Sequence, residues 1–162
     1  MRAKILLIGV FCMVAALAVP VALAAESVVR AGGVQLDIPD GWSKIDRAAE
    51  PPGSDPRTLL VVGTKGARPI ATPCQVASYR VPNDGAVVVV VGWSEGFLDK
   101  PKLELTKLRK PTFACFDGRG AVGQVTRKGR DYQVSIMVGD DASPQTIREA
   151  FAVARSFALV QR

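Results

Sequence analysis

The sequence predicts an α+β fold, in which an antiparallel β-sheet of about six or seven strands carries a C-terminal helix on one face. Short apolar or alternating segments recur along the chain between turn residues, which is typical of antiparallel strands. One segment, Val87–Val91, is apolar at every position, as expected of a strand in the middle of a sheet. Near the C-terminus the apolar residues instead recur with helical spacing, at Ile147, Ala150, Phe151 and Ala154.

The N-terminal residues resemble a secretory signal peptide. Met1–Lys4 is positively charged, Ile5–Val19 is apolar, and Ala22–Ala24 has the small-x-small pattern of a cleavage site. We therefore expect a signal peptide over residues 1–24, and a single α+β domain over residues 25–162 that is secreted or held in the cell envelope. The alternative is an uncleaved anchor, because the apolar run is nearly long enough to span a bilayer.

The cysteines agree with export. Cys12 lies in the predicted signal peptide, so Cys74 and Cys115 remain, and an oxidising compartment favours a disulfide between them. Closing a loop of this length would contribute on the order of 4 kcal/mol. Two free, buried thiols are the alternative interpretation.

The charge excludes one class of partner. The chain has a formal net charge of +6, which loss of Arg2 and Lys4 with the signal peptide lowers by two. A mildly basic protein suits an anionic envelope surface, but this charge is small for a nucleic-acid-binding domain. We expect no nucleic-acid partner, and no stable membrane span once the signal peptide is cleaved.

The first strands are expected after a frayed start at Glu26–Arg30. Val34–Ile38 alternates apolar and polar residues, and the turn Pro39–Gly41 leads into a short strand at Trp42–Ile45. Residues 47–56 are rich in proline and should form a surface loop.

The middle of the chain predicts a hairpin. Leu59–Val62 forms the next strand, and Cys74–Val81 then pairs with Ala86–Val91 across the turn Pro82–Gly85. Farther on, Leu103–Thr106 alternates and is expected to be an exposed edge strand.

A second hairpin and a helix complete the fold. Ala121–Arg127 and Arg130–Val138 flank the turn residues Lys128 and Gly129. Ser143 is a favourable N-cap and Pro144 suits the first helical position. Phe157–Val160 is either a last strand or an extension of the helix.

Signatures of catalysis are weak. The chain has no histidine, which excludes Ser-His-Asp and Cys-His arrangements and argues against a zinc site. Gly118–Gly123 matches G-x-G-x-x-G, but strand-like sequence follows it where a dinucleotide site needs a helix, so a turn and a β-hairpin are favoured. Asp140 and Asp141 lack the alternating oxygen donors of a calcium loop. We expect no metal and no cofactor.

Basic and aromatic residues after the valine run are the candidate binding residues. The basic members are Lys100, Lys102, Lys107, Arg109 and Lys110, with Arg119, Arg127, Lys128 and Arg130 farther along the chain. If the hairpin tips face the same way, these side chains form one cationic patch for anionic phospholipid, cell-wall phosphate or an acidic protein. The alternative is a solvated edge strand that its lysines protect from pairing.

Two aromatic residues, Trp93 and Phe97, flank Gly96. If exposed, they form a recognition patch. If buried, they complete the core, which is the favoured interpretation for aromatic residues beside a central strand.

Some blocks of the sequence resemble a family of exported, functionally uncharacterised bacterial proteins, mostly from actinobacteria. These blocks are Pro39–Trp42, Asp55–Thr58, Cys74–Trp93 and Cys115–Gly120. The resemblance implies a compartment and a domain, and no reaction. The opening strand, the Pro-x-Gly-Trp turn and the C-terminal helix are also similar to the Mog1/PsbP-like α/β/α sandwich, whose members are mostly non-enzymatic binding or assembly proteins.

The expected function is a non-catalytic extracytoplasmic binding or interaction module, for which an anionic envelope component or another envelope protein is the candidate partner. The first alternative is a small secreted hydrolase with paired carboxylates, which would need a concave site and at least one raised pKa. Its candidate acids are Glu95, Asp99, Glu104 and Asp117. The second alternative is a purely structural domain.

Overall fold

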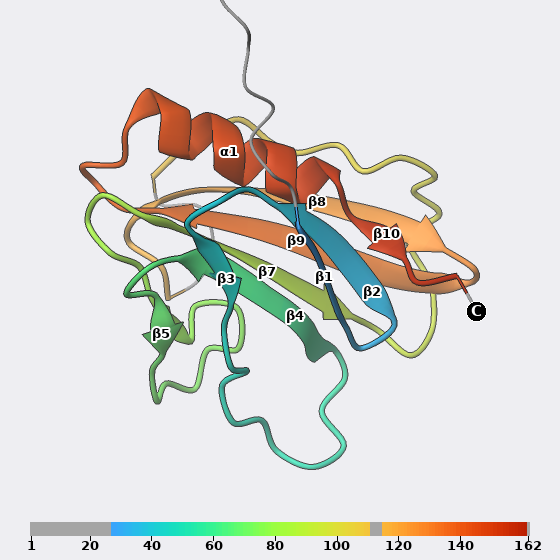
Figure 1. Ribbon diagram of the computed structural model, residues 1–162. Coiled ribbons are helices and arrows are strands. Elements are labelled where there is room, and N and C mark those ends of the chain that lie inside the picture. Colours follow the sequence, from blue (N-terminus) through green and yellow to red (C-terminus); the bar gives the residue numbers. More distant parts are fainter. Residues whose placement is uncertain (1–26, 111–114, 162) are drawn as a thin grey trace, which may run out of the picture.

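The computed structural model describes residues 27–110 and 115–161, in which antiparallel strands dominate and one helix lies near the C-terminus (Figure 1). The α+β fold is therefore confirmed. The strands are β1 (Ser27–Ala31), β2 (Val34–Ile38), β3 (Trp42–Lys44), β4 (Arg57–Thr64), β5 (Arg68–Pro69), β6 (Tyr79–Arg80), β7 (Ala86–Gly92), β8 (Arg119–Arg127), β9 (Arg130–Val138) and β10 (Ala158–Leu159), and the helix is α1 (Pro144–Arg155).

The strands divide among three sheets instead of forming the expected single sheet of six or seven strands. The largest has five strands in the order β3-β4-β7-β9-β8, and β1-β2-β10 and β5-β6 form two smaller sheets. After β2 the turn Pro39–Gly41 changes the chain direction, and the amide of Trp42 donates to the carbonyl of Pro39. The apolar face of β2 consequently packs onto the large sheet, and β2 does not extend that sheet.

The central position of β7 is confirmed. All seven of its residues are buried, and it pairs with β4 on one side and β9 on the other. Val88 and Val90 pack into the core beneath α1, whereas Val87, Val89 and Val91 pack into a second core on the opposite face. A strand covered on both faces needs apolar residues at every position, which explains the valine run.

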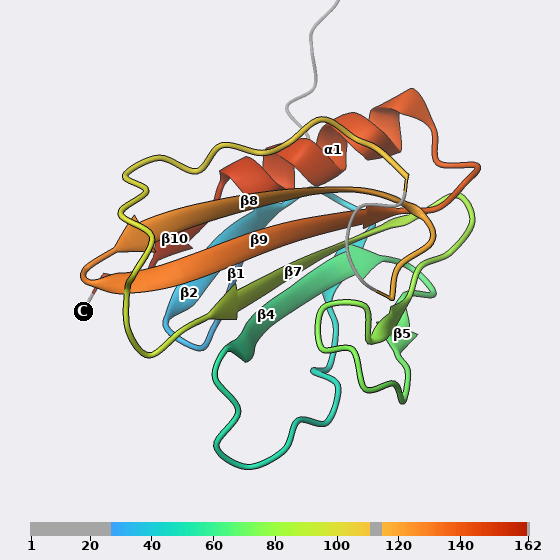
Figure 2. The same ribbon diagram turned by 180° about the vertical axis from the view of Figure 1, so that it is seen from behind.

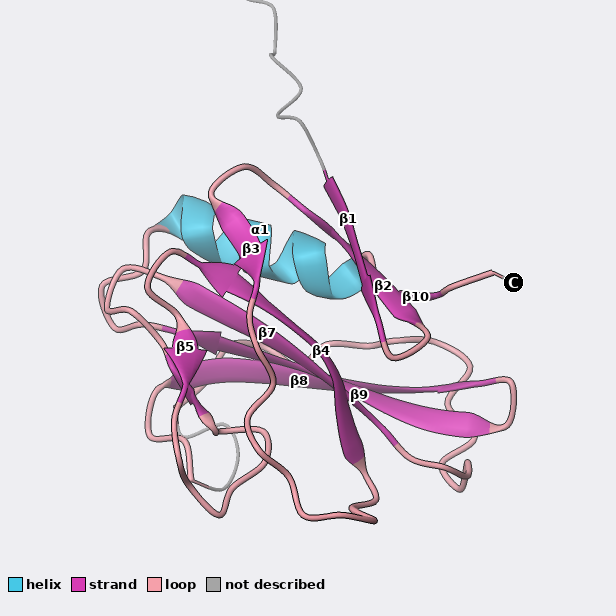
Figure 3. Cartoon of the chain, turned by 60° about the horizontal axis from the view of Figure 1, so that its bottom comes forward, coloured by secondary structure: helices cyan, strands magenta, loops and turns pink. Residues whose placement is uncertain are grey.

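Helix α1 and the three-stranded sheet cover one face of the large sheet (Figure 3). Ser143 caps the helix as predicted, because its hydroxyl accepts from the amide of Thr146 at 3.0 Å. Ala150 and Ala154 of the predicted stripe are buried, and Ile147 and Phe151 are half-buried. The chain then continues as β10, which pairs with β2, so the strand interpretation of this end is correct.

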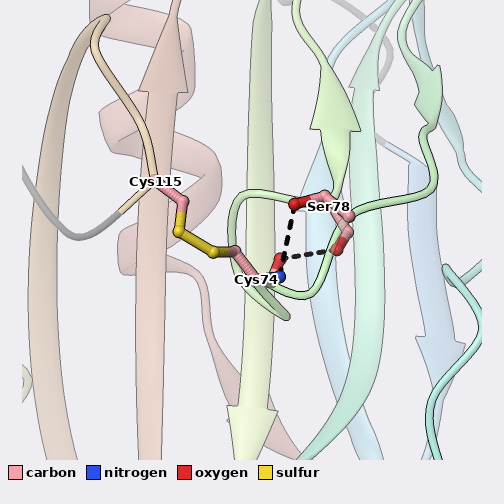
Figure 4. The surroundings of a disulfide bond; sticks show 4 residues. Cys74, Ser78 and Cys115 are labelled. Atoms are coloured by element: carbon pink, nitrogen blue, oxygen red, sulfur yellow. Dashed lines mark hydrogen bonds between the residues drawn. A yellow bond between two sulfur atoms is a disulfide. The ribbon is translucent and has the colours of Figure 1, made fainter.

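Irregular segments cover the opposite face. Tyr79 and Ile45 pack there against the odd-numbered valines of β7. The predicted Cys74–Cys115 disulfide is present, with a Cα–Cα distance of 6.2 Å (Figure 4). Beside it the Ser78 hydroxyl donates to the carbonyl of Cys74 at 2.5 Å. The disulfide and this turn hold the covering segment to the start of the β8–β9 hairpin.

Two predictions are wrong, the frayed start of the domain and the hairpin between Cys74–Val81 and β7. Ser27–Ala31 forms β1 along β2, and is not a frayed start, because its backbone groups pair with the free edge of β2. The segment Cys74–Val81 does not pair with β7. Both edges of β7 are occupied, by β4 and β9, so only Tyr79–Arg80 becomes a strand, and it pairs with β5.

The predicted edge strand at Leu103–Thr106 is not a regular strand. The segment runs along β8 (Figure 2) and bonds to it at intervals, for example from the amide of Thr106 to the carbonyl of Val122 at 2.9 Å. Leu103 and Leu105 turn toward Gly123, whose missing side chain leaves room for them. The segment therefore covers the edge of β8 instead of presenting a new one.

No helix within the described residues is long and apolar enough to cross a membrane. The predicted signal peptide, residues 1–24, lies outside the described ranges.

Candidate functional site

A cleft of about 360 Å³ opens where β4, β7 and β9 end at the same side of the large sheet. In the strand register Arg57 of β4 lies opposite Gly92 of β7, and Gly92 lies opposite Tyr132 of β9. Directly opposed residues of antiparallel strands project from the same face. An arginine and an aromatic ring therefore stand on either side of a position that has no side chain, and all three residues line the cleft.

Arg57, Gly92 and Tyr132 form one cross-strand row, and a second cross-strand row lies two positions farther along the strands. If the same register is continued, Asp55 faces Ser94, and Ser94 faces Arg130. The hydrogen bonds agree, because the amide of Ser94 donates to Asp55 Oδ1 at 3.0 Å and its hydroxyl donates to Oδ2 at 2.5 Å. These two bonds lower the pKa of Asp55, and the nearby charges of Arg57 and Arg130 lower it further. Both guanidinium groups thus lie within electrostatic range of one carboxylate.

Leu59 and the β1–β2 turn form the wall of the cleft. Gly32 has a φ of +58°, and a β-carbon there would lie 2.9 Å from the Leu59 side chain, so the turn can approach only with glycine at this position. Gly32, Arg57 and Leu59 also line a neighbouring hollow of about 730 Å³, to which Lys44 and Arg47 belong. The two hollows meet at Arg57.

The loop over residues 47–56 is irregular, as predicted, and is held in place by side chains. Glu50 Oε1 accepts from the amide of Thr58 at 2.9 Å and from Gln75 Nε2 at 2.7 Å. Burial alone would raise the pKa of Glu50, but these hydrogen bonds outweigh it and lower the pKa. The Tyr79 hydroxyl accepts from the amide of Ala48 at 3.1 Å, and burial raises its pKa. These contacts hold the loop in one conformation, so it forms a fixed wall of the site.

Phe97 stands at the rim beside the cleft. Its side chain is 68% exposed, so the interpretation that it completes the core is wrong, whereas Trp93 is half-buried and lines the cleft. The two rings meet edge to face, with centroids 6.0 Å apart. Of the two aromatic residues, only Phe97 is largely exposed to solvent.

The backbone that carries Phe97 is held by a buried carboxylate. Asp131 is 0% exposed and accepts from the amides of Phe97 at 2.7 Å and Leu98 at 3.0 Å, and from the Thr126 hydroxyl at 2.5 Å. Burial by itself would raise the pKa of Asp131, but the three hydrogen bonds outweigh it and lower the pKa. The same Thr126 oxygen accepts from the amide of Lys100. The segment from Phe97 to Lys100 is thus fastened to the β8–β9 hairpin.

The predicted basic residues separate into two groups. Lys100 lies beside Thr126 at the β8–β9 turn, whereas Arg109 lies beside Gly120 at the other end of β8. Six strand positions separate these two places, which is roughly 20 Å. Lys107 follows Thr106 toward the far end, and Lys110 is 3.6 Å from Asp140 there.

The end of the molecule that carries Phe97 therefore receives only part of the predicted patch. Its cations come from the Lys100 segment and from the β8–β9 turn, and Arg127 donates to the carbonyl of Pro101 between them. We call this group the aromatic tip. Its members are Trp93, Phe97, Lys100, Arg127 and Lys128.

No family model matches the chain, and no curated protein matches it either.

The acids of the hydrolase alternative do not gather in these clefts. Glu95, Asp99, Glu104 and Asp117 line none of the hollows described above. Glu50 and Asp55 do line one hollow, of about 520 Å³, but both pKa values are lowered, which is the wrong direction for a general acid.

No cluster of three or more metal-binding side chains of the His, Cys, Asp and Glu types occurs in the described part of the chain. Arg119–Gly123 of the glycine motif belongs to β8, so no helix follows the glycines as a dinucleotide site requires.

Sequence reasoning missed Asp55, Arg57 and Ser94. Asp55 and Arg57 flank Pro56 at the end of a loop, and Ser94 follows the valine strand, so no local pattern connects them. Only the register of β4 against β7 brings them to one cleft.

Proposed function

We propose that this chain is a non-catalytic, extracytoplasmic binding module that docks on an anionic phospholipid surface through its aromatic tip. The observation that carries the proposal is the Phe97 side chain, which is 68% exposed on a backbone that buried Asp131 holds. Among the large apolar side chains of the described residues that are exposed, Val28 reaches 44% and Ile70 reaches 40%. A fixed, outward-facing aromatic ring is a recurrent feature of interaction surfaces.

The charges around Phe97 complement an anionic surface. Lys100 and Lys128 are exposed beside it, and Arg127 is half-buried. An aromatic ring can enter the boundary between headgroups and acyl chains while neighbouring cations contact anionic headgroups. Trp93 supports Phe97 from the side at 6.0 Å, so the ring need not be ordered when it inserts.

The compartment is supported by separate observations. The Cys74–Cys115 disulfide is of a kind that persists outside the reducing cytoplasm. The expected signal peptide and the resemblance to exported bacterial proteins point to the same location, where anionic lipid headgroups are accessible.

The test is sedimentation of the mature protein with vesicles of phosphatidylglycerol and phosphatidylcholine, compared with vesicles of phosphatidylcholine alone. Phe97→Ser should weaken binding to the anionic vesicles about tenfold, because the ring no longer inserts. The matched control is Ile70→Ser, which removes another exposed apolar side chain far along the chain and should change nothing.

The electrostatic part is tested with Lys100→Glu/Lys128→Glu. At about 1 kcal/mol for each cation near an anionic surface, this variant should lose at least about thirtyfold in affinity. Lys107→Glu, at the other end of β8, is the control for net charge and is compared with Lys100→Glu alone, so that the two variants carry the same charge. Equal losses for both variants, or equal binding to neutral vesicles, would contradict the proposal. Retention of an envelope protein without lipid would assign the tip to a protein partner instead.

A further inference from the structure

We infer that the cleft between Arg57 and Arg130 is a binding site for a small organic anion: its carboxylate or phosphate lies between the two guanidinium groups, and its apolar part lies against Trp93 and Leu59. The inference rests on the cross-strand rows and does not depend on the proposed docking on lipid.

Two unpaired arginines converge on this cleft from different strands. Arg57 begins β4 and Arg130 begins β9, with β7 between them. Arg57 uses only its Nε in a hydrogen bond, to the carbonyl of Ser54 at 3.1 Å. Among the described residues, no carboxylate lies within ion-pair distance of either guanidinium group. Their terminal N–H groups are thus available to an anion, and paired guanidinium donors suit carboxylate and phosphate oxygens.

The carboxylate already in the cleft is occupied with another partner. Both oxygens of Asp55 accept from Ser94. Asp55 therefore fixes the rim of the cleft and leaves the arginine donors unused. Its negative charge opposes an incoming anion, but two positive charges face one negative charge, so the balance still favours an anion.

The shape of the cleft selects a ligand with an apolar part. Gly92 has no side chain between Arg57 and Tyr132, so the end of the Leu59 side chain can lie over it, where a β-carbon would meet that side chain at 2.7 Å. Leu59 and Trp93 supply apolar surface to the cleft. A volume of about 360 Å³ is at the small end of the range for ligand pockets, which is a few hundred to about 1,000 Å³. Inorganic phosphate alone would leave the apolar surface exposed to water, so a small ring or chain bearing one anionic group complements the cleft better.

The experiment titrates phenyl phosphate, benzoate, inorganic phosphate and phenol into the full mature protein, with amide NMR shifts and calorimetry as readouts. The anionic aromatic probes should bind at least tenfold more tightly than inorganic phosphate or phenol, and the amide signals of Gly92 and Ser94 should shift. The phosphate probe and the carboxylate probe also decide which anion the arginines prefer.

Substitutions of the arginines and of Asp55 should change the affinity for the probe in opposite directions. Arg57→Gln and Arg130→Gln should each weaken binding of the preferred probe at least fivefold, whereas Asp55→Asn should strengthen it because the repelling charge is gone. Arg148→Gln, an exposed arginine on α1, is the control and should have no effect. All these positions are exposed, so the variants should fold, and their amide spectra report this directly.

Three outcomes would overturn the assignment: no binding by either anionic aromatic probe, equal affinity in the arginine variants and the control, or weaker binding in Asp55→Asn. Failure of vesicle binding by Phe97→Ser would leave this assignment unaffected, because Phe97 does not line the cleft.

Discussion

At one end of β7, the closed end, Gly85 and Gly139 allow backbone segments to pack directly together, whereas at the other end, the open end, Gly92 lies among the residues that line the cleft. The amide of Gly139 donates to the carbonyl of Gly85 at 3.0 Å, and a β-carbon on Gly139 would overlap the carbonyl oxygens of Pro82 and Asn83. A β-carbon on Gly92 would instead meet the end of the Leu59 side chain at 2.7 Å. Glycine thus allows close packing of backbone at one end of the strand, and at the other end it allows close approach of a side chain that lines the cleft.

The two ends of β7 are expected to serve different purposes, stability at the closed end and binding at the open end. The closed end also contains the first residues of β8, which follow the disulfide, and the start of α1. The open end contains the cross-strand rows, the aromatic tip and the loop that Glu50 holds. We expect substitutions at the closed end to change the free energy of unfolding and those at the open end to change mainly binding.

The largest effect should come from the disulfide. Cys74 and Cys115 are 41 residues apart, and removing a cross-link of that span should cost about 4 kcal/mol through the entropy of the unfolded chain. Guanidinium-induced unfolding of C74S/C115S measures this cost. The probe that binds the open cleft should retain its affinity for the folded variant, and a parallel loss of affinity would contradict the separation of the two ends.

The direct comparison uses two glycine substitutions of the same kind. Gly139→Ala should cost about 3 kcal/mol or more, because the neighbouring atoms belong to the backbone and cannot move aside cheaply. Gly92→Ala should cost about 1 kcal/mol, since Leu59 can change its rotamer, but it should weaken probe binding because Leu59, which lines the cleft, is displaced. Thermal unfolding gives the loss of stability of each variant, and titration gives the affinity of each variant for the probe. A reversed order of stability would refute the assignment of the ends.

Asp131 provides a pH-dependent test at the open end. The pKa of Asp131 in the folded protein lies below its ordinary value of 3.8, so its contribution to stability is fully present above that value and is lost as the pH falls through the folded pKa. Asp131→Asn should cost about 2 kcal/mol at neutral pH, because a neutral amide with one acceptor oxygen replaces a carboxylate that accepts three hydrogen bonds with two oxygens. It should also flatten the acid limb of the stability curve below about pH 4.

The readout that separates this role from general destabilisation is the Phe97 segment. Hydrogen exchange at the amides of Phe97 and Leu98 should accelerate in Asp131→Asn more than exchange in β7 does, since both amides donate to one charged carboxylate oxygen, which the variant replaces with a weaker, neutral acceptor. Unchanged protection of these amides would show that Asp131 does not hold the aromatic tip.

Local patterns predicted the elements whose neighbours are close in the chain. The β8–β9 hairpin joins residues across the Lys128–Gly129 turn, and α1 follows from Ser143, Pro144 and an apolar stripe. The valines of β7 were sufficient to place it centrally. The prediction failed for Cys74–Val81, because its strand-like composition could not reveal that β4 and β9 already occupy both edges of β7.

The sequence by itself determined the α+β fold, the central strand, the capped helix and the single cysteine pairing that the structure contains, because each depends on residue spacing or on few alternatives. Only the tertiary structure decided where binding groups meet. The register of β4 on β7 and of β7 on β9 aligns Arg57, Gly92 and Tyr132, and Asp131 holds the backbone that carries the exposed Phe97. Registers and buried polar contacts join residues distant in the chain, so no local pattern encodes them.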